Sequence, residues 1–210
     1  MNETVQKIET DNDSEDQMEW FDSVKPGIDS KKVAIAGVFA ALSIAFSFIA
    51  EYLPRHPGWG IAYFDPVSII WIVSFLIGGF WIGSTTAIAG TLGLFIFDPT
   101  GIGPVFKFAA TYPMILVPYL GLLVIKQADD GSNLSHLGKL SVLMFFGLLL
   151  RLAFMIPMNL QIVPLFVPDL TPEYIIITVI LLNILQSVWD TIFPYLIVHK
   201  TGVFENYRMW

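Results

Sequence analysis

The chain has 210 residues, of which 55% are hydrophobic and only 14% charged, and its formal net charge is −7. It contains no cysteine, which excludes disulfides and thiolate metal sites, and its three histidines are too scattered along the chain to indicate a metal site. We therefore expect no metal ion, no cofactor and no nucleic-acid partner.

The negative charge belongs to the N-terminal segment. Residues 1–30 hold nine of the eighteen acidic residues against two lysines, a difference of −7, so residues 31–210 are neutral. A highly charged segment of low hydrophobicity cannot bury enough apolar surface to fold, and this one lacks the basic start of a signal peptide. We expect a disordered acidic cytoplasmic tail over residues 1–30, a membrane domain over 31–200 and a short cytoplasmic tail over 201–210.

Six apolar segments fill most of the remaining chain. A membrane-spanning helix needs roughly 20 mostly apolar residues at about 1.5 Å each. The second and third segments are shorter and share a tight turn at Gly83-Ser84, so they predict a helical hairpin. A soluble bundle would show polar residues at a 3.6-residue period, and residues 69–80 show none. The sequence thus predicts an all-α integral membrane protein with six transmembrane helices, over residues 33–53, 67–82, 85–97, 105–125, 140–160 and 174–198.

Lysine and arginine are unevenly distributed about the ends of these helices. With the N-terminus inside the cell, seven of them flank the inner ends, whereas only Arg55 and Lys107 flank the outer ends. Cytoplasmic loops of membrane proteins carry such an excess. We expect both termini in the cytoplasm and a multi-pass protein of the plasma membrane. The seven inner residues are Lys25, Lys31, Lys32, Lys126, Lys139, Lys200 and Arg208.

Small residues recur every four positions along the first apolar segment. Ala36 and Ala40 form one stripe, and Gly37, Ala41 and Ala45 form an adjacent one. Small residues at this spacing let a second helix approach closely. The two stripes indicate either packing inside the bundle or a docking surface for a separate membrane subunit, and the spacing does not decide between them.

Two ionisable residues, Arg151 and Asp190, lie well inside the fifth and sixth segments. Charges inside a membrane are costly and are candidates for function. Counted from the inner ends of their helices, both lie at a similar depth, which allows an ion pair between them. We expect a structural ion pair that fixes the packing of the last two helices; the alternative is a role in relaying ligand occupancy inward.

The sequence contains no motif of an enzyme active site. A P-loop, a His-Glu-x-x-His zinc motif and a Gly-x-Ser-x-Gly nucleophile elbow are all absent. Uncharged hydrogen-bonding residues instead occur toward the outer ends of the fifth and sixth segments, where an amide must find a partner. That partner is either a neighbouring helix or a ligand in a shared pocket. The candidate binding residues are Trp59, Tyr63, Phe64, Lys107, Asn159, Asn183 and Gln186.

Together these features resemble the substrate-binding S components of energy-coupling factor (ECF) vitamin transporters. The similarity covers residues 31–200. It rests on KKVAIAGVFAA at residues 31–41, on YFDP at 63–66 followed by FLIGGFWIG at 75–83, and on GIGP at 101–104. The riboflavin-specific members are the most similar, because they have an Asn followed five residues later by Pro, as in Asn159 and Pro164. They also have Asn-x-x-Lys in the last helix, where this chain has Asn183 and Gln186, a departure that changes the hydrogen bonds offered to a flavin.

The resemblance implies a protein that binds a vitamin, with riboflavin as the best guess, at the outer face under a lid formed by the first outer loop. It also implies partners: a transmembrane coupling subunit and two cytosolic ATPases, on which ATP hydrolysis would occur. Two alternatives remain, a secondary transporter that uses Arg151 and Asp190, and a membrane enzyme or assembly factor without a transport role. Co-purification with an ATPase pair would distinguish an S component from the secondary transporter. Ligand binding without turnover would distinguish it from the enzyme.

Overall fold

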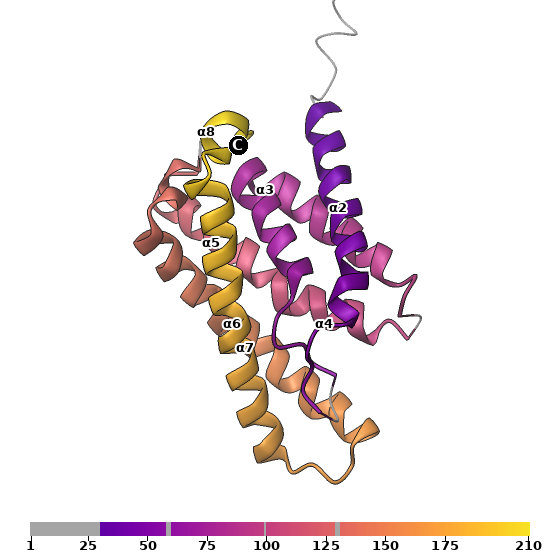
Figure 1. The fold of residues 1–210 in the computed structure, drawn as a ribbon. Coiled ribbons are helices and arrows are strands. Elements are labelled where there is room, and N and C mark those ends of the chain that lie inside the picture. Colours follow the sequence, from indigo (N-terminus) through magenta and orange to yellow (C-terminus); the bar gives the residue numbers. More distant parts are fainter. Residues whose placement is uncertain (1–29, 58–59, 99, 129–130) are drawn as a thin grey trace, which may run out of the picture.

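Long apolar helices make up most of the protein, which is described here by a computed structural model covering residues 30–57, 60–98, 100–128 and 131–210. Within these ranges the only extended pairing is a single bridge between Arg55 and Ala62. Five helices are long and apolar enough to cross a membrane, which confirms a helical membrane protein at this level (Figure 1). They are α2 (Ser30–Glu51), α3 (Pro66–Leu94), the joined pair α4 (Ile102–Thr111) and α5 (Pro113–Val124), α6 (Leu137–Phe166) and α7 (Pro172–Tyr195). The acidic tail predicted over residues 1–30 lies outside the described residues, except for Ser30.

The outer surface of the helices is apolar. Large hydrophobic side chains such as Val38, Leu92, Phe145 and Leu181 are more than half exposed. A soluble monomer rarely leaves so much contiguous apolar surface in water, whereas lipid would cover it. The exposed side chains therefore agree with the length and composition of the helices.

Helix α3 reverses its direction at Gly79. The backbone there has φ 76° and ψ −173°, a conformation that is essentially limited to glycine. A straight helix would separate residues 71 and 90 by about 28 Å, yet a Cβ on Gly90 would lie 2.7 Å from the indole nitrogen of Trp71. Residues 66–78 and 80–94 are therefore two antiparallel arms. The predicted hairpin exists, but its turn is not at Gly83-Ser84, because Gly83 lies within the second arm and faces Phe75.

Helix α2 packs against the second arm of α3. Ala36 and Ala40 are 1% and 5% exposed, and the Thr86 hydroxyl donates to the Ala36 carbonyl at 3.4 Å. The other stripe, Gly37, Ala41 and Ala45, is exposed. Ala36 and Ala40 thus pack inside the bundle, the first of the two alternatives for these stripes, and are not available as a docking surface for another subunit.

The last residues of the chain pack against the turn of the α3 hairpin. A π-helical turn, η2 (Leu196–Lys200), continues α7 and leads to the short helix α8 (Val203–Tyr207). The Trp210 indole N–H then donates to the carbonyl of Leu76, and the Met209 backbone N–H donates to the carbonyl of Ile77, both at 2.9 Å. These carbonyls lie at the end of a helical arm, where intrahelical partners run out. The end of the segment predicted as a short tail over residues 201–210 therefore packs on the bundle.

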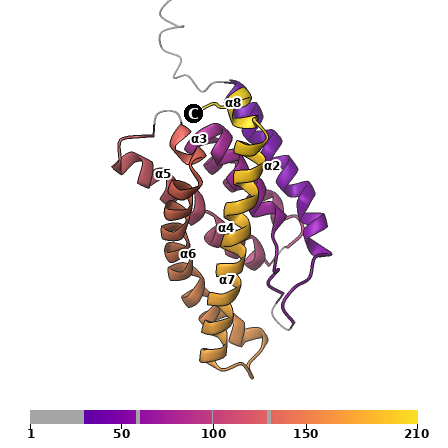
Figure 2. The same cartoon turned by 60° about the vertical axis from the view of Figure 1, so that its left-hand side comes forward.

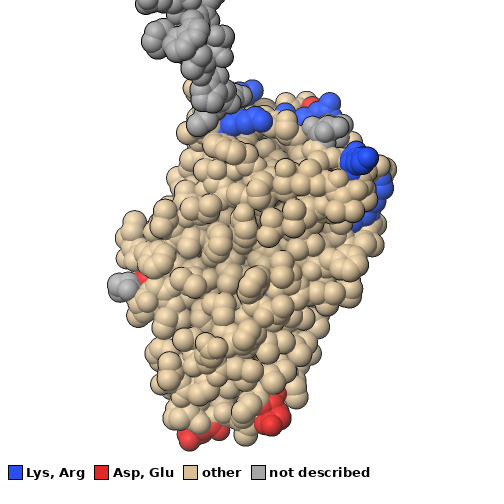
Figure 3. All heavy atoms as spheres, turned by 180° about the vertical axis from the view of Figure 1, so that it is seen from behind, with Lys and Arg blue, Asp and Glu red and all other residues tan. Residues whose placement is uncertain are grey.

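On the face seen in Figure 3, basic residues gather at one end of the bundle and acidic residues at the other, and the surface between them is almost entirely uncharged. The start of α2 and the C-terminus lie at the same end of the bundle, as Figures 1 and 2 show. The chain order of the helices places most described basic residues at that end and only Arg55 and Lys107 at the opposite end. The basic residues near the C-terminal end are Lys31, Lys32, Lys126, Lys139, Lys200 and Arg208.

Candidate ligand-binding site

A cavity of about 430 Å³ lies toward the end of the bundle that is opposite the C-terminus. It is enclosed by the end of α2, the loop between α2 and α3, the end of α3, helix α4 and the second half of α6. Its size suits a small organic molecule. Its charged and amide side chains are Glu51, Arg55, Asp65, Asp98, Lys107, Arg151, Asn159 and Gln186.

One face of α6 forms a wall of the cavity. Arg151, Met155, Asn159 and Val163 follow one another at intervals of four residues, which places them on one side of the helix. All four are at most 6% exposed. Arg151 and Asn159 are two turns apart, roughly 12 Å along the axis. The wall therefore offers two polar positions separated by an apolar one.

A largely buried polar cluster closes the inner end of this wall. The Arg151 guanidinium donates through Nε to Asn183 Oδ1 at 2.6 Å, through one terminal nitrogen to Asp190 Oδ2 at 2.7 Å, and through the other to Gln186 Oε1. The second Asp190 oxygen accepts from the Ser68 hydroxyl at 2.5 Å. The two ionisable residues singled out in the sequence thus form an ion pair, in which each side chain is 2% exposed.

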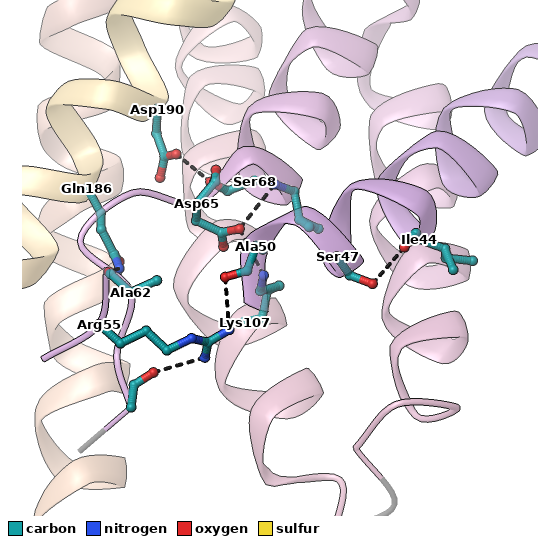
Figure 4. A network of polar contacts seen from close by, with 12 residues as sticks. Ile44, Ser47, Ala50, Arg55, Ala62, Asp65, Ser68, Lys107, Gln186 and Asp190 are labelled. Atoms are coloured by element: carbon teal, nitrogen blue, oxygen red, sulfur yellow. Dashed lines mark hydrogen bonds and ion pairs between the residues drawn. The ribbon is translucent and has the colours of Figure 1, made fainter. Parts of the chain in front are cut away.

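The same cluster holds the loop between α2 and α3. Gln186 donates through Nε2 to the carbonyl of Ala62, and Figure 4 shows Gln186 and Asp190 of α7 directed toward this loop and the start of α3. Arg55 connects the loop to the end of α2, because its guanidinium donates to the carbonyl of Gly60 in the loop at 3.0 Å and to the carbonyl of Ala50 in α2 at 3.1 Å. The loop is therefore a compact turn that is fastened to the buried cluster.

The end of the loop is joined to α4 by a second ion pair. Asp65 caps α3 by accepting from the Val67 backbone N–H at 3.0 Å, and the same carboxylate oxygen accepts from Lys107 Nζ at 2.8 Å. Ser68 links this pair to the buried cluster, because its hydroxyl also lies 2.9 Å from the Asp65 carbonyl oxygen. Both cations that face the inner part of the cavity are thus already paired with a carboxylate.

Asp98, on the loop before α4, is a third carboxylate at the cavity. The Thr100 hydroxyl, with help from the backbone N–H of Gly103 at 2.8 Å, lowers the pKa of this carboxyl below its usual value. With a lowered pKa, Asp98 is ionised at neutral pH. Its carboxylate oxygens accept hydrogen bonds from the loop itself. Its role in the structure is thus to shape the turn that leads into α4.

The structure brings together only some of the residues predicted for the site. Lys107, Asn159 and Gln186 line the cavity. Asn183 lies behind it, where it accepts from Arg151 and donates to the Val179 carbonyl at 2.8 Å.

Tyr63 and Phe64, two of the aromatic residues predicted for the first outer loop, do not line the cavity. Phe64 packs against Phe193 and Trp189 of α7, with ring centroids 5.6 and 6.4 Å apart, and Tyr63 lies beside His56. Trp59 lies outside the described residues. Among the described residues of this loop, the cavity is instead lined by Arg55, Gly60, Ile61, Ala62 and Asp65.

Several residues at the cavity were not singled out in the sequence as binding residues. Arg151 was expected to form a structural ion pair, with a relay or transport role as the alternative, and Met155 carried no prediction. The four-residue interval from Arg151 to Val163 nevertheless indicates one helix face. Arg55 and Asp65 gave no comparable signal, because their position depends on how the loop folds back over α4 and α7.

Comparison of the chain with models of protein families, with curated proteins and with solved structures finds no match. The geometry of the site and the sequence motifs therefore carry the functional argument.

Proposed function

We propose that this protein is the substrate-binding S component of an ECF-type importer and that it captures a vitamin, with riboflavin as the best-fitting ligand. The observation that supports the proposal is the cavity at the end of the bundle, which combines an apolar wall with a few fixed polar groups. Sites for small heterocyclic ligands have this composition, because apolar burial supplies affinity and placed polar groups fix orientation. Asn159 and Gln186, two residues of the motifs that resemble the riboflavin-specific members, line it.

The proposal includes six membrane crossings with both termini in the cytoplasm. The two arms of α3 count as separate crossings of roughly 20 Å each, shorter than the hydrocarbon core of about 30 Å, so their ends are recessed among the other helices. The excess of basic residues near the C-terminal end supports a cytoplasmic location of that end. The cavity then faces the outside of the plasma membrane, where a scarce nutrient is captured.

Transport would depend on partner subunits. The sequence has no P-loop, so ATP hydrolysis is assigned to two cytosolic ATPases, and a transmembrane coupling subunit would contact this protein within the membrane. The exposed stripe of Gly37, Ala41 and Ala45 is the remaining part of the predicted contact surface, since a Cβ on Gly37 would meet nothing within 4 Å. Its flat profile allows close approach of a second helix.

Titration of the purified protein with riboflavin tests the proposed ligand. Quenching of tryptophan fluorescence is expected on binding, and Asn159→Ala should weaken it roughly five- to 150-fold, because losing one partner of a buried hydrogen bond costs about 1–3 kcal/mol. The exposed Asn206→Ala variant is the matched control. If riboflavin does not bind the wild type while another vitamin does, the ligand is wrong; if no vitamin binds, the proposed function is wrong.

Leucine substitutions on the two stripes of α2 separate folding from coupling. Ala40→Leu adds bulk in the contact with α3, so melting temperature, ligand binding and vitamin uptake should all fall. Ala41→Leu adds bulk on the exposed stripe, so the melting temperature and binding should remain while uptake by cells that contain the partner subunits is lost. Normal uptake in the Ala41→Leu variant would show that this stripe faces lipid only.

A further inference from the structure

The guanidinium of Arg151 belongs to the wall of the cavity as well as to the buried cluster. Its side chain is only 2% exposed, yet it lies among the residues that enclose the cavity. A guanidinium has five N–H donors, and the described residues accept three of them, one each on Asn183, Gln186 and Asp190. Two of its N–H donors therefore have no acceptor among the described residues.

We propose that Arg151 is a ligand-binding residue, and that the inner end of the cavity takes the uncharged, planar acceptor edge of a ligand, such as an amide or cyclic imide carbonyl. This inference rests on the proposed function only in taking the cavity as a binding site for a small molecule. It changes the role of Arg151, for which the sequence suggested a structural ion pair.

The three existing hydrogen bonds hold the guanidinium in one orientation. Asn183 is itself fixed by its bond to the Val179 carbonyl, and Gln186 by its bond to the carbonyl of Ala62. The planar group therefore cannot turn to follow a ligand, and the ordering that binding would otherwise require is already complete. A fixed fork of donors selects acceptors by geometry as well as by charge.

The polarity of the inner end excludes a ligand that leads with a cation. Lys107 has three N–H donors and makes one described bond, to Asp65, so the inner end offers spare donors from both Arg151 and Lys107. Asp190 does not line the cavity, and its two oxygens already accept from Arg151 and Ser68. An ammonium or amidinium group would meet N–H donors there and would find no free acceptor on Asp190.

The charge balance argues against a carboxylate as well. Each nearby cation is already neutralised, Arg151 by Asp190 at 2.7 Å and Lys107 by Asp65 at 2.8 Å. A ligand carboxylate would lose its hydration on entering the cavity and would find no unpaired cation there. Burial of such an excess charge is unfavourable. Carbonyl oxygens and ring nitrogens accept the same hydrogen bonds without that desolvation cost.

Three compounds that differ only in the group opposite the amine test this chemistry: 4-aminobenzamide, 4-aminobenzoate and 4-aminobenzamidine. Binding to the detergent-purified protein is measured by saturation-transfer NMR and by the shift of the melting curve. The neutral amide should bind at least tenfold more tightly than the carboxylate, and the amidinium should show no binding. The inference would be overturned if 4-aminobenzamidine bound as tightly as 4-aminobenzamide, or if 4-aminobenzoate bound more tightly than 4-aminobenzamide.

The variant Arg151→Lys tests the residue itself, because it keeps the positive charge beside Asp190 and removes the planar fork. It should weaken binding of 4-aminobenzamide roughly tenfold, the loss expected for a buried hydrogen bond, while Arg208→Lys at the opposite end leaves it unchanged. If Arg151→Lys does not fold, the three compounds on the wild-type protein still decide the question.

The outcomes also separate this inference from the proposed function. If riboflavin binds but none of the three compounds does, and Arg151→Lys binds riboflavin as well as the wild type, the assignment of Arg151 is wrong and the proposed function stands. If the amide binds in an Arg151-dependent manner while no vitamin binds, the assignment of Arg151 stands and the proposed function is wrong.

Discussion

The variant Asp190→Ala is expected to destabilise the protein by about 3–5 kcal/mol, because it leaves the Arg151 guanidinium buried without its counter-ion. The two side chains are each 2% exposed and 2.7 Å apart, so the unpaired guanidinium would be poorly solvated. The Ser68 hydroxyl loses its acceptor on Asp190 at the same time. The measurement is the apparent melting temperature in a fixed detergent at a fixed heating rate, since membrane proteins often unfold irreversibly.

Two further variants show whether the effect comes from the unpaired charge. The loop variant Asp169→Ala removes an exposed carboxylate and should leave the melting temperature unchanged. The double variant Arg151→Met with Asp190→Leu removes both charges, and apolar replacement of a buried ion pair is often neutral or stabilising. A double variant that melts as low as Asp190→Ala would contradict the electrostatic explanation and point to packing instead.

The double variant has a second use. It should regain stability yet fail to bind a ligand that needs the Arg151 donors. If the ion pair served packing alone, the double variant would still bind the ligand. Stability and binding therefore report on different roles of the same arginine.

The variant Gly79→Ala should lower the stability by about 1–3 kcal/mol, the cost of holding a non-glycine residue in a backbone conformation of this kind. At φ 76° and ψ −173° a Cβ is strained whatever space surrounds it, and it would also lie 3.4–3.5 Å from Trp210. The strain falls on the turn between the two arms of α3. We expect a lower melting temperature.

Gly37→Ala is the matched control for this variant. Gly37 is helical and exposed, and its added Cβ would meet nothing within 4 Å. Alanine favours a helix over glycine by up to about 1 kcal/mol, so stability should be unchanged or slightly higher. Equal losses in the two variants would show that α3 does not need the special conformation at Gly79.

The buried ion pair shows how far depth along a helix can be read from sequence. Arg151 and Asp190 were matched by counting residues from the inner helix ends, and a fixed rise of 1.5 Å per residue makes such counting reliable. The bonds of Asp190 to Ser68 and of Arg151 to Gln186 could not be predicted in this way. Ser68 joins the cluster because α3 lies beside α7, and Gln186 joins it because the face of α7 that carries Asp190 packs against α6; both contacts depend on packing over the whole bundle.

The sequence by itself determined the features that depend on local composition and period. These are the helical membrane class, the positions of the long apolar helices and the concentration of basic residues at one end. Each follows from residues that act on their immediate surroundings: an apolar stretch seeks lipid, and a basic loop resists translocation.

Only the tertiary structure decided the features that depend on contacts between distant residues. Gly79 and Gly83 are equally able to turn, and packing of the two arms selected Gly79. Ala40 and Ala41 are equally small, and the direction in which α2 faces α3 made one of them internal. The cavity follows the same rule, because Arg55 and Asp65 reach it through a folded loop, whereas Phe64 of the same loop turns toward α7.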